Sequence, residues 1–226
     1  MLEQQKTTAI LLFSRTSADE AAVKTFAFPQ KNAAVAERLI QHTIATAEKT
    51  QLPLFKACNT PQNGNSFGER LANEIETVFQ KGYESIIVIG NDCPKLSAKH
   101  LVQAKKQVQQ EKVVLGPAND GGVYLIGFQK KTYDRANFLN LDWEKETLQA
   151  TWKAQIEDIV WLETLSDIDS AVDLSVFLKT APKWHTLRQL LVAILKEIEL
   201  IIDANHKLLT RFHFNSSALR APPFQV

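Results

Sequence analysis

The strongest constraint on the fold of this chain is a regular alternation of strand-type runs with stretches of helical periodicity. A continuous apolar run buries both faces of a strand, and helices between such strands favour a mainly parallel sheet that is covered on both sides. The sequence therefore predicts an α/β domain. The expected strands lie at 9–13, about 53–58, 86–90, 113–115, 123–127 and 159–162. The expected helices lie near 36–47, 71–79, 97–109, 144–155 and 170–178.

Two other regions do not follow this alternation of strands and helices. Residues 14–30 are polar and are expected to form an irregular loop that ends at Pro29. After a break at Pro182, an apolar stripe from Leu187 to Ile201 predicts an added helix of about 25 residues, which packs on the domain or on a second subunit. The prolines near 221–224 predict an extended end. We therefore divide the chain into a domain at 1–180 and a C-terminal extension at 181–226.

Composition excludes several classes of protein. The net charge is +1, from 26 basic and 25 acidic residues, and no basic block indicates nucleic-acid binding. No stretch approaches the ~18 apolar residues of a membrane span, and the run at 9–13 is too short for a signal-peptide core. Cys58 and Cys93 do not suggest a disulfide framework. We therefore expect a cytoplasmic protein without zinc, phosphate-loop or dinucleotide motifs.

Asp92 follows the apolar run at 86–89, and Pro94 ends that strand. Open α/β sheets place ligand sites at the carboxyl ends of their strands. An aspartate there supplies the hard oxygen that Mg²⁺ or Mn²⁺ requires beside a phosphate. The structural alternative is that Asp92 caps the following turn.

A second aspartate turn is formed by Asp120, Gly121 and Gly122. Consecutive glycines allow close approach of the backbone to a ligand, so their amides are candidates for binding a phosphate or sugar hydroxyl. The alternative is an ordinary hairpin, because Asp-Gly is a strong hairpin signal. The preceding Gly116-Pro117 adds turn-forming residues that a two-residue hairpin does not need.

Basic residues near the first strand are candidates for contacting an anion. Arg15 and Lys24 lie in the loop after that strand, directly beyond Ser14. Arg70 lies at a helix start and either binds an anion or pairs with Glu74 at helical spacing.

A third acidic group comprises Asp167, Asp169 and Asp173. Capping and helix-dipole roles are the simpler reading, because a helix follows directly. A metal or base role stays open, since the group also follows a predicted strand.

Several segments together carry a recognisable pattern. They are Gly90-Asn91-Asp92-Cys93-Pro94-x-Leu96, Gly116-Pro117-Ala118-x-Asp120-Gly121-Gly122-x-Tyr124-Leu125-Ile126-Gly127, Gly68-Glu69-Arg70-Leu71, Glu146-Thr147-Leu148 and Asp167-Ile168-Asp169. The pattern spans about 8–178 and resembles the DUF2064 family of the GT-A glycosyltransferase superfamily. The resemblance implies a GT-A-like three-layer α/β/α sandwich, the nucleotide-diphospho-sugar transferase fold.

The resemblance also implies roles for residues. Asp92 would hold Mg²⁺ or Mn²⁺, and Asp120 would orient or deprotonate the acceptor hydroxyl. The residues expected to bind the nucleotide donor are Ser14, Arg15, Lys24, Arg70, Asn91, Gly121 and Gly122. The family's first loop usually reads Pro-Gly-x-x-Lys-Thr-Arg-Leu; here Lys24 and Thr25 match, whereas the glycine and the arginine are missing.

Three functions follow as hypotheses. The first is a metal-dependent transfer of a sugar from a nucleoside-diphosphate sugar to a small acceptor. The second is a nucleotidyltransferase that joins a nucleoside triphosphate to a phosphorylated small molecule; the absence of glycine at 14–27 disfavours it. The third is a non-catalytic binding or assembly protein, which uses the C-terminal helix as an interface and forms a homo-oligomer.

Overall fold

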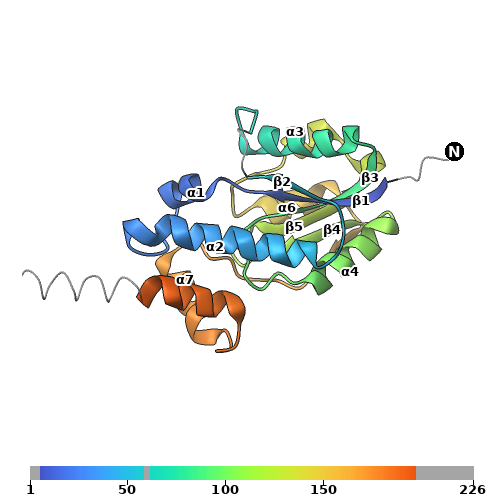
Figure 1. Ribbon diagram of the computed structural model, residues 1–226. Helices are drawn as coiled ribbons and strands as arrows, with labels where there is room; N and C mark the ends of the chain where they lie inside the picture. The colour runs from blue at the N-terminus through green and yellow to red at the C-terminus, as the bar shows by residue number, and fades with distance from the viewer. Residues whose placement is uncertain (1–5, 59–61, 197–226) are drawn as a thin grey trace, which may run out of the picture.

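The computed structural model describes residues 6–58 and 62–196. Six strands form one sheet in the order β2-β1-β3-β5-β4-β6 (Figure 1). Their bounds are β1 Lys6–Phe13, β2 Leu54–Ala57, β3 Tyr83–Ile89, β4 Val113–Pro117, β5 Val123–Gln129 and β6 Ile159–Trp161. All six strands expected from the sequence are confirmed.

The sheet is mostly parallel, with β5 as the exception. β1 pairs in parallel with β2 and β3, and β4 pairs in parallel with β6, whereas β5 runs antiparallel to both β3 and β4. The short connection from Pro117 to Val123 explains this direction, because a few residues can join only antiparallel neighbours. The carboxyl ends of the other five strands therefore share one edge of the sheet.

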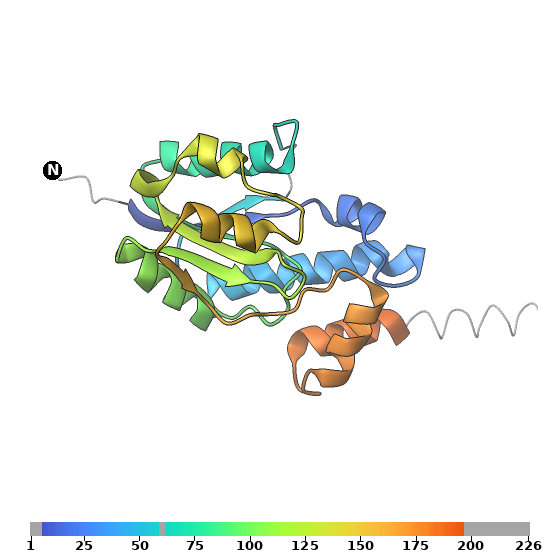
Figure 2. The same cartoon turned by 180° about the vertical axis from the view of Figure 1, so that it is seen from behind.

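Helices cover both faces of the sheet (Figures 1 and 2). One core lies between the sheet and helices α3, α5 and α6, and the other lies between the sheet and helices α2 and α4. Alternate residues of β1 and β3 point into the two cores, which is the period of two expected for strands. The helices are α1 Ser17–Val23, α2 Pro29–Glu48, α3 Phe67–Gln80, α4 Ala98–Gln109, α5 Arg135–Leu139, α6 Leu148–Gln155 and α7 Ala171–Thr180, with a short 3-10 helix at Lys130–Thr132.

A third apolar cluster attaches the start of the C-terminal extension to the domain. The N-terminal half of α2 and helix α7 pack there against a helix that begins at residue 186. Leu187 and Leu191 are buried, whereas Leu190 is 39% exposed. The predicted burial of the stripe is thus confirmed at Leu187 and Leu191 and is wrong at Leu190. Ile198, Ile201 and the end predicted to be extended lie outside the described residues.

Two short helices were not expected. The predicted irregular loop at 14–30 contains α1, which begins where the Thr16 hydroxyl accepts the N–H of Asp19. Helix α5 begins in the same way, at Asp134. Neither helix carries a long apolar stripe, so periodicity could not reveal them. In contrast, Ser97 caps α4 as the sequence predicts.

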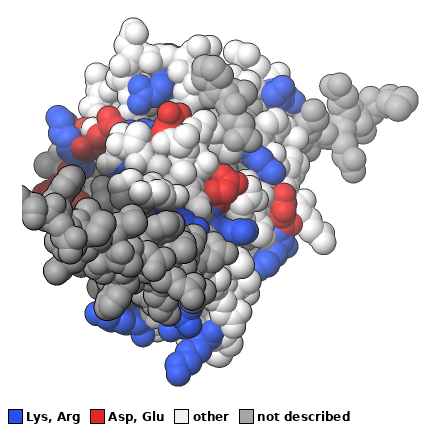
Figure 3. All heavy atoms as spheres, turned by 60° about the vertical axis from the view of Figure 1, so that its left-hand side comes forward, with Lys and Arg blue, Asp and Glu red and all other residues white. Residues whose placement is uncertain are grey.

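The surface of the described residues is mixed in charge. Basic and acidic side chains are interspersed on the face shown in Figure 3, in keeping with the net charge of +1. Among the helices of the described part, none is long and apolar enough to cross a membrane.

The third cluster predicts different costs for two leucines of one helix. We expect Leu191→Ala to lower the free energy of unfolding by about 2–5 kcal/mol, because it leaves a cavity among buried side chains. Leu190→Ala is the matched control and should cost less than about 1 kcal/mol. Urea denaturation of both variants measures the difference. Equal effects would show that the extension does not pack as described.

Candidate functional site

The centre of the candidate site is Lys24, which follows α1. Its Nζ lies 2.8 Å from Oδ2 of Asp92 and 2.7 Å from Oδ1 of Asp169, and the side chain is only 15% exposed. A third carboxylate, that of Glu20, places Oε2 3.5 Å away. Burial alone would lower the pKa of Lys24, but these carboxylates outweigh it and raise the pKa above its ordinary value. Lys24 is therefore a firmly charged, largely enclosed ammonium.

Backbone contacts fix the three segments that meet at Lys24. The segment after α1 forms a parallel bridge between Thr25 and Ser170. The N–H of Ile168 donates to the carbonyl of Asp92 at 2.8 Å. These contacts hold the loop after β1, the end of β3 and the segment before α7 together, so their charged side chains meet at the carboxyl edge of the sheet.

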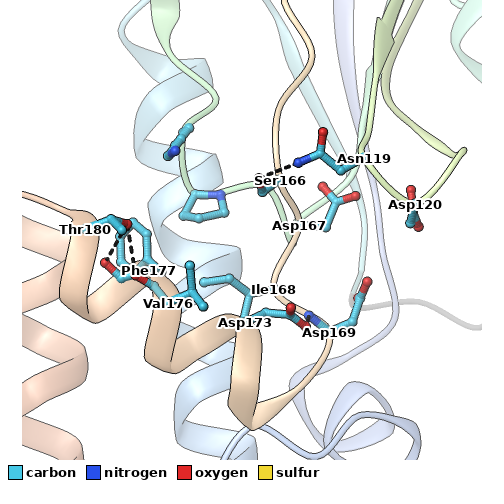
Figure 4. A pocket seen from close by; sticks show the side chains of 12 residues that line it. Asn119, Asp120, Ser166, Asp167, Ile168, Asp169, Asp173, Val176, Phe177 and Thr180 are labelled. Atoms are coloured by element: carbon cyan, nitrogen blue, oxygen red, sulfur yellow. Dashed lines mark hydrogen bonds between the residues drawn. The ribbon is translucent and has the colours of Figure 1, made fainter.

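Three carboxylates form a triad beside this lysine. Asp120, Asp167 and Asp169 each offer an oxygen within 4.8 Å of the other two. Figure 4 shows Asp120 on the loop after β4 and the other two on the segment before α7. A short stretch of parallel pairing between Ala118 and Leu165 brings these two segments side by side.

Burial and neighbouring carboxylates disfavour the charged forms of Asp167 and Asp169. Burial first, and then the neighbouring carboxylates, raise the pKa of Asp167 to about 8. Burial also raises the pKa of Asp169, although Lys24 works against that shift. Oδ1 of Asp167 is buried and has no hydrogen-bond partner among the described residues. A set of hard oxygens with one unsatisfied atom suits a divalent cation such as Mg²⁺ or Mn²⁺.

The predicted acidic group therefore divides. Asp173 accepts from the backbone N–H of Ser170 at 3.0 Å and completes a capping box at the start of α7. The capping interpretation is confirmed for this residue. Asp167 and Asp169 instead face Asp120, and the strand before them was the sequence signal that kept this possibility open. The sequence predicts no role for Glu20, because it lies in α1, a helix that the sequence pattern does not reveal.

Three cavities meet along this edge. The largest, about 820 Å³, is lined among others by Arg15, Lys24, Arg70 and Asp92. The second, about 290 Å³, is a junction lined by Lys24, Asp92 and all three carboxylates of the triad. The third, also about 290 Å³, has the same triad on one side and apolar residues of α7 on the other (Figure 4).

The structure brings most predicted donor-binding residues to one cavity. Ser14, Arg15, Lys24, Arg70 and Asn91 all line the largest cavity. Ser14 and Asn91 are buried polar residues in its wall.

The two basic side chains that flank Lys24 are less constrained. Arg15 lies 3.8 Å from Glu20 and 3.7 Å from Glu144, and its side chain is 40% exposed. Within the described residues, the guanidinium of Arg70 forms no ion pair, and the alternative pairing with Glu74 is absent. Both groups remain able to contact an anion in the cavity.

The two glycines act mainly through the turn. The N–H of Gly122 donates to Oδ1 of Asp120 at 2.9 Å, and the N–H of Gly121 donates to the carbonyl of Ala118 at 3.3 Å. Gly121 has φ +91°, and a Cβ there would lie 2.3 Å from the carbonyl oxygen of Glu146. In the folded turn these amides therefore hold Asp120 in place, and their contact with a phosphate stays a prediction.

Asp92 and Cys93 can also be assigned. Metal binding by Asp92 stays a prediction: its Oδ2 pairs with Lys24, and it lies beside the triad rather than within it. Cys93 is 2% exposed, and burial raises the pKa of its thiol. A buried structural cysteine, the simpler expectation, is confirmed.

Comparison with known proteins agrees with this architecture. The profile of a family described as "Uncharacterized protein conserved in bacteria (DUF2064)" matches residues 27–145. The chain belongs to this family. No curated protein matches the sequence.

Solved structures share the fold. A protein of Desulfovibrio desulfuricans G20, provisionally named a nucleotide-diphospho-sugar transferase, is 19% identical, with 86% of this chain and 98% of that chain covered and a TM-score of 0.67. A manganese complex of Rv0371c from Mycobacterium tuberculosis H37Rv is 12% identical, with 79% and 100% covered and a TM-score of 0.44. The first likeness shows the nucleotide-diphospho-sugar transferase fold, and the second is too distant to support an argument about the site.

The raised pKa of Asp167 predicts a pH dependence of stability in metal-free protein. Between the ordinary pKa of 3.8 and the folded value of about 8, the native state holds a proton that the unfolded state has lost. The free energy of unfolding should therefore fall as pH rises through this window, by at most about 1.4 kcal/mol per unit from this group. Asp167→Asn should flatten the slope in urea denaturation with a chelator present. An unchanged slope would contradict the assignment.

Proposed function

We propose that this protein is a metal-dependent transferase that moves a sugar from a nucleoside-diphosphate sugar to a small acceptor. One observation carries the proposal: a large cavity, lined by three basic and three acidic side chains, meets a triad of carboxylates at the carboxyl edge of the strands. That edge is where open α/β sheets bind their ligands. The arrangement supplies a place for a diphosphate, a place for a divalent cation and an adjoining pocket.

The largest cavity supports the donor side of the proposal. Its volume of about 820 Å³ lies within the range of small-molecule sites. The cavity offers phosphate oxygens the ammonium of Lys24, which acts as a point charge, and the planar guanidinium groups of Arg15 and Arg70. Such charge-assisted hydrogen bonds would hold the diphosphate with the sugar directed toward the junction.

The triad supports the metal. Asp120, Asp167 and Asp169 would hold a divalent cation through carboxylate oxygens, with Asp92 next to it. A cation bound there would neutralise charge on the leaving diphosphate. Mg²⁺ and Mn²⁺ both suit this donor set.

The third cavity supports the acceptor side. It adjoins the triad, and Val176 and Phe177 supply an apolar wall opposite the carboxylates (Figure 4). An acceptor hydroxyl placed there would attack the anomeric carbon as the bond from that carbon to the diphosphate oxygen breaks. Asp120, whose side chain is exposed to the pocket, is the group we assign to accept the hydroxyl proton.

A nucleotidyltransferase is the second candidate, and the same pocket argues against it. Its acceptor would bring a phosphate into a cavity lined by four aspartates and one lysine, Lys95. Repulsion between like charges disfavours that substrate. The first loop adds to the argument, because it forms helix α1 instead of a glycine-rich cradle.

Calorimetric titration tests the proposal. We expect UDP-sugars or GDP-sugars to bind more tightly with Mn²⁺ than without it. Asp120→Asn should weaken the metal-dependent part by about tenfold or more, since it removes one charged ligand but keeps the oxygen that accepts from Gly122. Asp173→Asn is the matched control, because Asp173 lines the same pocket outside the triad.

The outcomes separate the candidates. Binding of nucleoside triphosphates alone would favour the nucleotidyltransferase. No binding of any nucleotide, with or without Mn²⁺, would leave only the non-catalytic binding or assembly role, with the C-terminal extension as its interface. Equal effects of the two asparagine variants would refute the metal role of the triad.

A further inference from the structure

One carboxylate belongs to two different charge clusters. Oδ1 of Asp169 forms an ion pair with Nζ of Lys24 at 2.7 Å. Asp169 is also a member of the triad that suits a divalent cation. A cation in the triad would therefore share a ligand with an ammonium that is already bound to it.

We propose that Lys24 is a built-in counter-ion that competes with the divalent cation for Asp169 and moves to the donor's diphosphate when that cation binds. The inference rests on the proposed function and adds to it a coupling between metal and nucleotide. Without the cation, Lys24 neutralises Asp92 and Asp169. With the cation, the charge on these carboxylates is balanced from the other side, and the ammonium is released.

Lys24 has a place to move. It lines both the largest cavity and the junction, so its Nζ lies at the boundary between the proposed diphosphate and the triad. A lysine has a flexible four-carbon stem, and its three N–H donors rotate together about the Cε–Nζ bond. A small rotation would turn the ammonium from Asp169 toward a phosphate in the larger cavity.

Glu20 is a carboxylate that can stay close to Lys24 while the ammonium moves. Its side chain is 4% exposed and lies one helical turn before Lys24 on the chain. Its Oε2 is 3.5 Å from Nζ and has no hydrogen-bond partner among the described residues. Because Glu20 lines the largest cavity, it can retain Lys24 after Asp169 is lost to the cation. Glu20 is a positioning residue in this account.

Competition between Lys24 and the cation leads to cooperation between the cation and the nucleotide. The ammonium opposes cation binding when no nucleotide is present, because two positive charges share Asp169. A diphosphate that takes the ammonium removes this opposition, so nucleotide and metal strengthen each other's binding. Thermodynamic linkage requires the two effects to be equal in free energy.

Two titrations of Lys24→Met test the proposal. In the first, Mn²⁺ alone should bind the variant on the order of tenfold more tightly than the wild-type protein, which lies within the usual range of coupling between sites. In the second, UDP in the presence of Mn²⁺ should bind the variant more weakly, again by about tenfold. A residue that only stabilises the fold would not change the two affinities in opposite directions.

Two further variants separate competition from a general charge effect. Lys24→Arg keeps the positive charge and should keep the wild-type Mn²⁺ affinity. Lys95→Met removes a lysine that lines the acceptor pocket and has no ion pair among the described residues, so Mn²⁺ affinity should change by less than about threefold. If Lys95→Met tightens Mn²⁺ binding as much as Lys24→Met, the competition for Asp169 is refuted.

The remaining outcomes are also decisive. Unchanged or weaker Mn²⁺ binding by Lys24→Met would overturn the proposal. If that variant does not fold, Glu20→Gln combined with Lys24→Gln preserves the local charge balance and should show the same tightening. The Mn²⁺ titration needs no nucleotide, so failure of every nucleotide to bind would refute the proposed function while the first titration still decides the competition.

Discussion

The site depends on one buried ammonium and the carboxylates that surround it. Asp92, Asp169 and Glu20 come from three segments far apart in the chain. Glu20 is buried and would be costly to bury without an opposite charge, whereas Asp92 and Asp169 stay partly exposed. Lys24 provides that charge at a single point. Without it, the end of β3, helix α1 and the segment before α7 would place like charges against one another. Because Lys24 pairs with Asp169, this member of the triad is shared between the ammonium and the proposed cation site.

The antiparallel direction of β5 places Asp120, the member of the triad that comes from the β4–β5 turn, at the site. Because β4 and β5 are joined by a short turn, Asp120 is held at the carboxyl edge instead of being carried away on a crossover helix. Contacts between that turn and the segment after β6 then bring Asp120 toward Asp167, including the hydrogen bond from the N–H of Asn119 to the carbonyl of Leu165. The turn conformation, fixed by Gly121, is thus a requirement of the triad.

The sequence was sufficient for the sheet but only partly sufficient for the site. Apolar runs located every strand, because burial on both faces leaves a clear pattern. The same reasoning correctly places Asp92 at a strand end and predicts a metal there, while it leaves a metal role open for the acidic group at Asp167, Asp169 and Asp173. The partner of Asp92 is Lys24, which directly follows α1, a helix with a capping residue but no apolar stripe.

Long-range pairing limited the prediction elsewhere as well. Local sequence favours capping roles for Asp167 and Asp169, whereas long-range contacts, among them the isolated bridge between Ala118 and Leu165, bring them to Asp120. Such a bridge has no local sequence signature. The hydrogen bonds that the amides of Gly121 and Gly122 form within the turn likewise depend on the folded structure and leave no pattern in the sequence.

The most direct test of this account is anomalous diffraction at the manganese edge from crystals grown with Mn²⁺ and UDP. The account predicts one strong peak between Asp120, Asp167 and Asp169, with Nζ of Lys24 on a phosphate oxygen and no longer on Asp169. A peak elsewhere, or a peak in the triad with Lys24 still bound to Asp169, would contradict it.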